Sequence, residues 1–188
     1  MKNFLSLLVI ALTGFFLLSS DAFAQETIKM KPMTPDKLQI DPGVISKLKP
    51  DLVVTEFRLT GRPTVNQQKS VEVPIRVVIR NQGQTPAKIF KTAVEYKDPK
   101  SQNTYVVAFN VPGQSDSWYP LTKGPLPPNA EVAFSGKVTF HPSVRGVTVD
   151  LRAMADSCSG DEFMPKHCRV DETNEGNNYS KPIAVKLP

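Results

Sequence analysis

A regular alternation of apolar and other side chains over residues 69–81 constrains the fold of this chain more than any other feature. Five apolar side chains occupy every second position of this run: Val71, Val73, Ile75, Val77 and Ile79. Successive side chains of a β-strand point to opposite faces, so the run predicts a strand with one buried face. Pro74 lies in the run without an N–H group, and its missing donor must point away from a neighbouring strand or lie at a bulge.

Six further short runs show the same alternation, with polar turns between them. They span residues 53–59, 90–96, 105–111, 132–140, 147–155 and 183–187. Seventeen prolines and ten glycines are spread through the chain, and no long segment shows helical periodicity. Because each strand must bury its apolar face, we expect an all-β fold with seven antiparallel strands packed as an immunoglobulin-like sandwich. A small barrel is the alternative.

The first residues have the three parts of a Sec-type signal peptide. Lys2 precedes an apolar run over residues 4–18, and Ala22-Phe23-Ala24 forms a small-x-small cleavage site. The apolar run is shorter than the roughly 20 residues that span a bilayer. We therefore expect cleavage near Ala24, and a mature chain without a membrane span that is periplasmic or secreted.

These features divide the chain into three parts. Residues 1–24 form the predicted signal peptide. Residues 25–50 are polar, rich in Lys and Pro, and lack a sustained apolar period, which is typical of a flexible leader. The folded domain is predicted over residues 51–188.

The two cysteines, Cys158 and Cys168, follow an export signal and would meet an oxidising compartment. They are therefore expected to pair as one disulfide. A structural zinc site would need a second pair of ligands, and a redox-active pair is usually Cys-x-x-Cys, so both alternatives are less favoured.

The formal charge of +5 raises the question of an anionic partner. Nucleic-acid binding usually requires clustered Lys and Arg, whereas the basic residues here are scattered among carboxylates. No nucleic-acid partner is expected in an exported chain. The charge instead favours contact with anionic material of the cell envelope, or it forms a solvated surface.

Four stretches together resemble a known family. They are PDLVV at residues 50–54, RNQG at 80–83, LPPNA at 126–130 and DETNEGNN at 171–178. Over about residues 50–187 the chain is similar to the cell-adhesion-related domain of bacteria, usually called CARDB. The resemblance implies an immunoglobulin-like, seven-stranded sandwich in an exported or surface protein. It also implies a role in binding or adhesion, without naming a ligand.

An acidic, amide-rich stretch lies between the sixth and seventh predicted strands. Its carboxylates Asp161, Asp171, Glu172 and Glu175 are oxygen ligands of the kind that calcium prefers, although their spacing is not that of an EF-hand loop. Asn and Gly adopt turn conformations readily, so a purely structural turn is the alternative. Glu172, Asn174 and Glu175 are also candidate ligand-binding residues. We expect no cofactor unless this stretch binds calcium.

The single tryptophan, Trp118, stands beside Tyr119 in a stretch of polar and turn-forming residues. An exposed aromatic pair can stack on a sugar ring or anchor a protein partner. Alternatively, the two rings cap the open end of the sandwich and are buried there. Both residues are candidates for ligand binding.

The known signatures of catalytic sites do not occur in this sequence. The two histidines, His141 and His167, fall at a predicted strand end and inside the predicted disulfide loop. There is no Gly-x-Ser-x-Gly elbow, His-Glu-x-x-His helix or phosphate-binding glycine loop, so we expect no catalytic residues and no enzyme. The favoured function is an exported, non-catalytic binding or adhesion module that contacts a protein or polysaccharide of the cell envelope. The alternatives are a calcium-stabilised structural envelope protein and a hydrolase.

Overall fold

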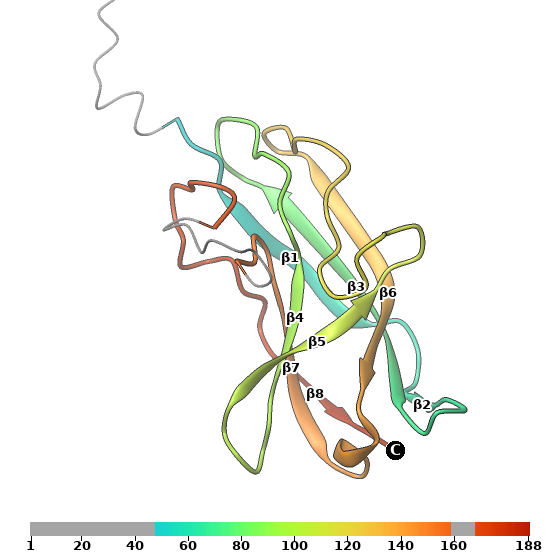
Figure 1. Ribbon diagram of the computed structural model, residues 1–188. Coiled ribbons are helices and arrows are strands. Elements are labelled where there is room, and N and C mark those ends of the chain that lie inside the picture. Colours follow the sequence, from blue (N-terminus) through green and yellow to red (C-terminus); the bar gives the residue numbers. More distant parts are fainter. Residues whose placement is uncertain (1–47, 159–167) are drawn as a thin grey trace, which may run out of the picture. The chain divides into compact units, whose positions relative to one another are not determined.

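The computed structural model describes residues 48–158 and 168–188, which contain eight β-strands and one short 3-10 helix (Figure 1). The strands are β1 (Leu52–Leu59), β2 (Thr64–Val65), β3 (Val71–Asn81), β4 (Ala93–Lys97), β5 (Thr104–Asn110), β6 (Glu131–Phe140), β7 (Thr148–Met154) and β8 (Ile183–Lys186). The predicted signal peptide, most of the predicted leader, Asp161 and His167 lie outside the described residues. Among the residues that the structure describes, no helix has the length and apolar character that a membrane span needs.

The predicted all-β character is confirmed, because each of the seven alternating runs corresponds to one strand. Within residues 48–158 and 168–188, only the two-residue β2, which pairs with the start of β3, adds to that set. Every strand pair is antiparallel, as expected for a chain with short turns and no long crossover helices.

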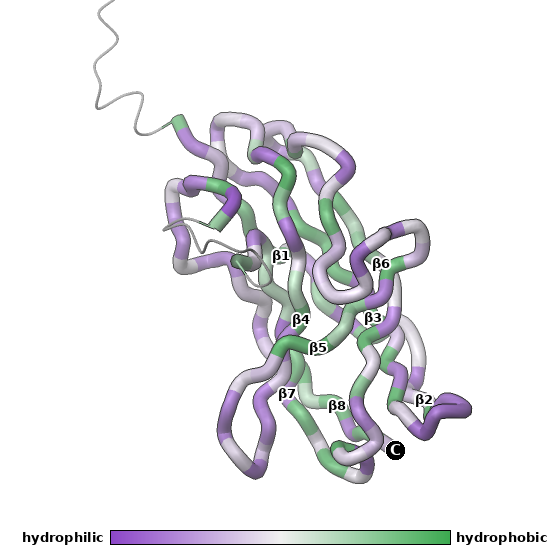
Figure 2. Tube along the Cα trace, in the orientation of Figure 1, coloured by the Kyte–Doolittle hydropathy of each residue, from purple (hydrophilic) through white to green (hydrophobic). Residues whose placement is uncertain are grey.

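The alternation on β3 produces the centre of the apolar core. Its five alternating residues, from Val71 to Ile79, are fully buried, and Phe90, Phe109 and Leu151 are fully buried from other segments. Figure 2 shows hydrophobic and hydrophilic residues following one another along the strands. Each buried side chain of this size stabilises the fold by roughly 1.5–3 kcal/mol relative to exposure, so the inward face of β3 fixes its register.

The strands form one hydrogen-bonded path in the order β1-β3-β6-β5-β4-β7-β8. Strand β5 connects its two halves: residues 104–107 pair with β4, and residues 108–110 pair with β6. The sheet is nearly closed into a barrel. It remains open because its end strands, β1 and β8, do not pair with each other in the described part of the chain. The confirmed part of the fold prediction is therefore the antiparallel all-β structure. Two separate packed sheets are not established by this path.

Pro74 lies within a central strand, yet it leaves no ladder hydrogen bond unmade. Its carbonyl accepts a hydrogen bond from the backbone N of Thr60 at 2.9 Å. The N and C=O groups of one residue point to the same side of an antiparallel strand, so the proline nitrogen also faces the chain beyond Leu59, where β1 ends. The missing donor thus points away from a paired strand, as the sequence required.

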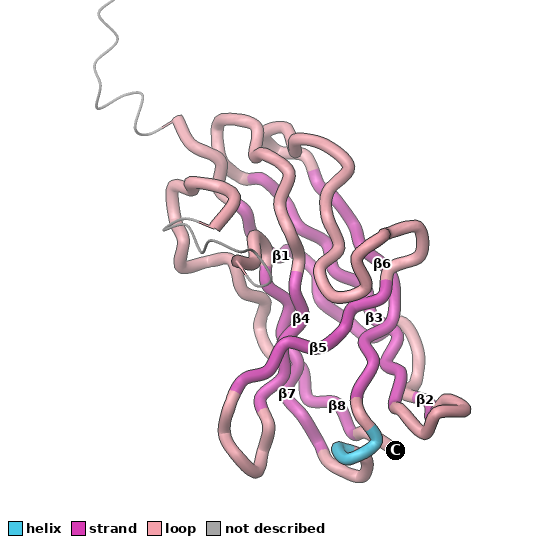
Figure 3. Tube along the Cα trace, viewed as in Figure 1, coloured by secondary structure: helices cyan, strands magenta, loops and turns pink. Residues whose placement is uncertain are grey.

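The short helix η2 (Pro142–Val144) connects β6 to β7 at the end of the strands opposite to where β1 begins (Figure 3). His141 precedes it, and the ring Nδ1 accepts a hydrogen bond from the backbone N of Ser143 at 3.2 Å. His141 thus lies just after the end of β6, at the strand end where the sequence placed it, and its ring caps the turn that follows.

Candidate functional site

The four stretches that carry the family resemblance meet at one end of the strands. The backbone N of Gln82 donates to the Asp51 carbonyl at 2.8 Å, and that of Thr173 donates to the Pro50 carbonyl at 2.9 Å. The loop before β6 joins them through Asn129, whose backbone N donates to the Asn81 carbonyl at 2.7 Å. We call these residues, 49–52, 81–85, 126–130 and 171–178, the terminal network.

Asn81 lies at the centre of the terminal network and is fully buried. Its Oδ1 accepts from the backbone N of Asp51 at 3.1 Å and of Gly83 at 3.0 Å. Its Nδ2 donates to the carbonyls of Thr85 at 2.8 Å and Leu126 at 2.9 Å. Both N–H groups and both acceptor positions of the amide are therefore used inside the fold.

Glu172 connects the last part of the network to β1 and is only 4% exposed. Its Oε2 accepts from the backbone N of Leu52, and its Oε1 accepts from Asn178 Nδ2 at 3.1 Å. Burial raises the pKa of this carboxyl to about 8, against the effect of the Leu52 hydrogen bond, and the neighbouring charges of Asp156 and Glu175 raise it further. The Glu172 carboxylate therefore links β1 to residues 172–178, and this linking group can be protonated.

Asp156 is a second buried carboxylate at this end, fully inaccessible to solvent. It accepts hydrogen bonds from the backbone N of Arg169 at 3.2 Å and of Val170 at 2.8 Å. Burial raises the pKa of Asp156 to about 6, and these bonds oppose the rise. Asp156 thus fixes the chain where it leaves the loop closed by the Cys158–Cys168 disulfide, which is present as predicted.

The side chains of the other acidic and amide residues predicted here also bond to groups of the protein itself. Asp171 Oδ1 pairs with Lys49 Nζ at 2.8 Å, and Glu175 Oε1 accepts from the backbone N of Glu172 at 3.0 Å. Asn174 is exposed, and its Oδ1 accepts from the backbone N of Gly176 at 2.9 Å. The two bonds within residues 172–176 are those of the structural turn that the sequence offered as the alternative to a ligand site, whereas the Lys49–Asp171 pair ties the stretch to the segment before β1.

No cation site emerges from the carboxylates that the structure describes. Within residues 48–158 and 168–188, no group of three or more His, Cys, Asp or Glu residues is arranged to hold a metal ion. Asp161, the remaining calcium candidate, lies outside these residues. The calcium site with Asp161, Asp171, Glu172 and Glu175 stays a prediction.

The aromatic loop, residues 114–121, is the second predicted site, and it connects β5 to β6. Asp116 Oδ1 accepts from the backbone N of Trp118 at 2.7 Å and of Tyr119 at 3.1 Å. The Gln114 side chain donates to the Leu121 carbonyl at 3.1 Å and accepts from its backbone N at 3.3 Å. Four side-chain contacts therefore hold this loop in one conformation.

The two aromatic residues of this loop differ in exposure. Trp118 is 49% exposed, so the alternative in which both rings are buried does not hold for it. Tyr119 is half-buried, and Lys91 Nζ lies 5.5 Å from its ring centroid. Ile89, which is 43% exposed, belongs to the segment that pairs with the chain just after the loop. The loop thus presents a fixed tryptophan to solvent beside a tyrosine that contacts a cation.

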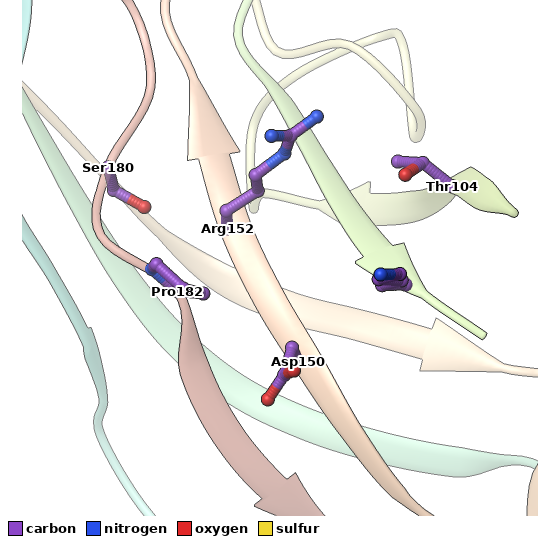
Figure 4. A pocket seen from close by; sticks show the side chains of 6 residues that line it. Thr104, Asp150, Arg152, Ser180 and Pro182 are labelled. Carbon is purple, nitrogen blue, oxygen red and sulfur yellow. The ribbon is translucent and has the colours of Figure 1, made fainter. Parts of the chain in front are cut away.

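A third site, which the sequence did not suggest, is a hollow of about 200 Å³ on the outer face of β4, β5 and β7 (Figure 4). We call it the outer pocket, and its lining residues are Lys97, Thr104, Asp150, Arg152, Ser180 and Pro182. The alternation on the sixth predicted strand places Asp150 and Arg152 on its polar face, and that was the only signal in the sequence. Nothing in the sequence brings them next to Lys97 and Ser180.

Comparisons with known proteins give structural matches only. No family model matches the sequence, and no curated protein matches it. The CARDB domain of the PF1109 protein from Pyrococcus furiosus, solved in complex with di-metal ions, is similar with a TM-score of 0.45 and 18% identity, over 74% of this chain and 90% of that one. A Bordetella pertussis structure assigned as an ApaA protein gives a TM-score of 0.38 and 17% identity, over 74% of this chain and 96% of that one. The family that the four stretches resemble thus also appears among the structural matches.

Proposed function

We propose that this chain is an exported, non-catalytic binding module of the bacterial cell envelope, built on an immunoglobulin-like fold. Its ligand is an envelope polysaccharide, which the aromatic loop contacts through Trp118. The observation that carries the proposal is that Trp118 is 49% exposed although its backbone is held by Asp116. An exposed ring on a fixed loop loses little conformational freedom when it stacks on a ligand.

The surroundings of Trp118 suit a sugar. Tyr119 adds a second aromatic surface next to it, and the Lys91 ammonium contacts that ring. The formal charge of +5 favours approach to anionic polymers, which are common in bacterial envelopes. The function therefore rests on a rigid loop held by the strands.

Binding of the purified chain to isolated envelope polysaccharide tests this function. The Trp118→Ala variant should lose at least about tenfold in affinity, because a central aromatic contact contributes roughly 2 kcal/mol or more to such complexes. Tyr105→Ala is the matched control, since Tyr105 is an exposed aromatic residue on β5 and should leave the affinity unchanged. Equal binding by the wild type and Trp118→Ala would remove the proposal, as would Trp118-dependent capture of a protein alone.

Export is tested separately by identifying the amino terminus of the protein recovered from the periplasm and the medium. We expect the chain to begin at Gln25, after cleavage near Ala24. Recovery only from the cytoplasm with Met1 intact would contradict export.

A second candidate function, a calcium-stabilised structural envelope protein, has one favouring observation. The Oδ1 atoms of Asn177 and Asn178 are buried without a hydrogen-bond partner among the described residues, and Asn178 lies against Glu172. Unpaired amide oxygens beside a carboxylate suit calcium. Millimolar calcium should then raise the melting temperature and a chelator should lower it. A melting temperature that neither addition changes rejects this candidate.

A further inference from the structure

The outer pocket has the features of a small-ligand site. Figure 4 shows Asp150 and Arg152 on β7, Thr104 on β5, and Ser180 and Pro182 on the segment that leads into β8. Its volume of about 200 Å³ is below the roughly 300–1,000 Å³ that drug-sized ligands occupy, so a single small ring fits it. Three segments distant in sequence form its walls.

Arg152 is held in place before any ligand arrives. Its Nε and Nη2 donate to Glu95 Oε2 at 3.0 and 2.8 Å, and its guanidinium lies 4.2 Å from the ring centroid of Tyr179. Two contacts on different sides fix the plane of the group. A guanidinium has five N–H donors, and these bonds use two of them, so donors remain for a ligand in the pocket.

Lys97 supplies the second positive charge. It stands directly opposite Asp150 in the pairing of β4 with β7, yet within the part of the chain that the structure describes the two side chains form no ion pair. Both residues are exposed at the rim of the pocket. The Lys97 ammonium can therefore donate to an anionic group, while the Asp150 carboxylate can accept from a hydroxyl.

The mixture of donors and acceptors specifies the chemistry of the ligand. Arg152, which keeps free donors beside its ion pair with Glu95, and Lys97 can both donate to a carboxylate or similar anion, and bonds of this kind are stronger than neutral ones. Asp150 would repel a bare anion, but it would bind hydroxyl groups beside one, as would the Thr104 hydroxyl. Pro182 adds an apolar surface at the rim. A ring that carries one carboxylate and several hydroxyls satisfies all of these groups together.

We propose that the outer pocket binds a carboxylate-bearing sugar, either free or as a unit of an acidic polysaccharide. The site is separate from the aromatic loop, so its existence does not depend on the role proposed for Trp118. If both sites act on one polymer, they provide two points of contact on the same chain.

Titration of the isotope-labelled full-length chain with sodium glucuronate, followed by NMR, tests the proposal. We expect saturable shift changes at Lys97, Thr104 and Arg152, with glucose and inorganic phosphate each binding at least about tenfold more weakly. Free glucuronate and a polymer of it distinguish the two sources of the ligand. Phosphate that binds as tightly as glucuronate would show a general anion effect and overturn the proposal.

Single substitutions test whether glucuronate binds in the outer pocket. Lys97→Ala should weaken glucuronate binding at least about tenfold, because it removes a charge-assisted bond. Asp150→Ala should weaken the binding of glucuronate but not that of phosphate, since only the sugar uses that carboxylate as an acceptor.

Lys88→Ala is the control, because it removes the same charge from an exposed position elsewhere, and it should leave the affinity for glucuronate unchanged. Trp118→Ala should bind glucuronate like the wild type even if it loses the polysaccharide. An unchanged affinity in Lys97→Ala, or an equal loss in Lys88→Ala, would reject the site.

Discussion

The terminal network and the aromatic loop contain the same kinds of polar side chain, but these side chains have different roles in the two regions. In the terminal network, the Asn81 amide and the Glu172 carboxylate are buried and bonded to backbone groups of other segments. In the aromatic loop, Asp116 and Gln114 bond only to neighbouring backbone, and Trp118 is left half exposed. The first region fixes how segments meet, while the second fixes one loop and leaves a ring for contact.

This difference shows that the polar motifs of this sequence mainly stabilise the fold and are not left free to bind a ligand. The acidic stretch at residues 171–178 is rich in groups that bind ligands, but its side chains make the bonds of a turn and of a tie to β1. Apart from the Asn177 and Asn178 amide oxygens, the groups proposed to contact a ligand lie in the outer pocket on the strand faces and in the aromatic loop. Substitutions should therefore separate into those that change stability and those that change binding.

Asn81→Ala should have the largest effect. It leaves four partners without the amide: the N–H groups of Asp51 and Gly83 and the carbonyls of Thr85 and Leu126. Unpaired buried groups cost about 1–3 kcal/mol each, and partial rearrangement brings the expected loss of unfolding free energy to about 4 kcal/mol. Urea unfolding measures it, with Asn103→Ala, an exposed turn residue, as the control expected to change by less than about 0.5 kcal/mol.

Loss of the disulfide should rank next. The Cys158–Cys168 bond closes a loop with a sequence separation of 10, and the chain-entropy model gives about 3 kcal/mol for a loop of that length. Replacing both cysteines by serine should lower the unfolding free energy by that amount without changing affinity for a ligand of Trp118. Reduction of the wild type with a thiol should reproduce the loss. A stability equal to that of the oxidised wild type would show that the loop is already constrained without the bond.

The pH dependence of the unfolding free energy should show how protonation of the buried Glu172 carboxyl affects stability. Its pKa is about 8 in the folded state and 4.5 in the unfolded chain, so the folded state binds the proton more tightly. The resulting stabilisation is fully present below pH 4.5 and is lost as the pH rises through 8. Asp156, with a pKa raised from 3.8 to about 6, loses its part by about pH 6. Between pH 6.5 and 9 we expect the unfolding free energy to fall by on the order of 2 kcal/mol.

Glu172→Gln is the matched variant for this measurement. The amide keeps an acceptor for the Leu52 N–H group but carries no charge to desolvate. Its unfolding free energy should stay nearly constant over the same pH range, so that it exceeds the wild type at pH 9. The same slope in both proteins would assign the pH dependence to other groups.

Trp118→Ala should have the smallest effect on folding. The ring is half exposed, and the loop bonds made by Asp116 and Gln114 reach only backbone groups and do not need the indole. The unfolding free energy should change by less than about 0.5 kcal/mol, although ligand affinity falls. Thermal unfolding monitored by far-UV circular dichroism measures the change. A loss of unfolding free energy above about 1 kcal/mol would show that Trp118 packs against the fold, as Asn81 does, and would contradict the difference drawn between the two regions.

The strands were predictable because their signal is local. The alternation on β3 fixes which face is buried, whichever strands lie beside it, and the disulfide was predicted from two cysteines that follow a predicted export signal. The division of β5 between two partners depends on non-local pairing, and no period in residues 104–110 encodes it.

The sites were less predictable because burial is decided by distant segments. Glu172 looks like a surface ligand until β1 is placed over it, and 120 positions separate it from its partner Leu52. Arg152 becomes part of a pocket only when β4 brings Glu95 and the segment before β8 brings Tyr179. For Trp118, the turn-forming neighbours did indicate a loop, and exposure was one of two outcomes that the sequence left open.

The terminal network also determines how the domain would respond to tension. The chain enters β1 at this end, where Pro50 and Leu52 are bonded to residues 172–173, and β8 finishes at the opposite end, where Leu187 bonds to Val147 (Figure 1). A pull between the two termini of the domain would therefore run along the strands and load many ladder bonds at once. Rupture under force is governed by the unfolding rate, so the strength of these ladders would set how long such a link holds.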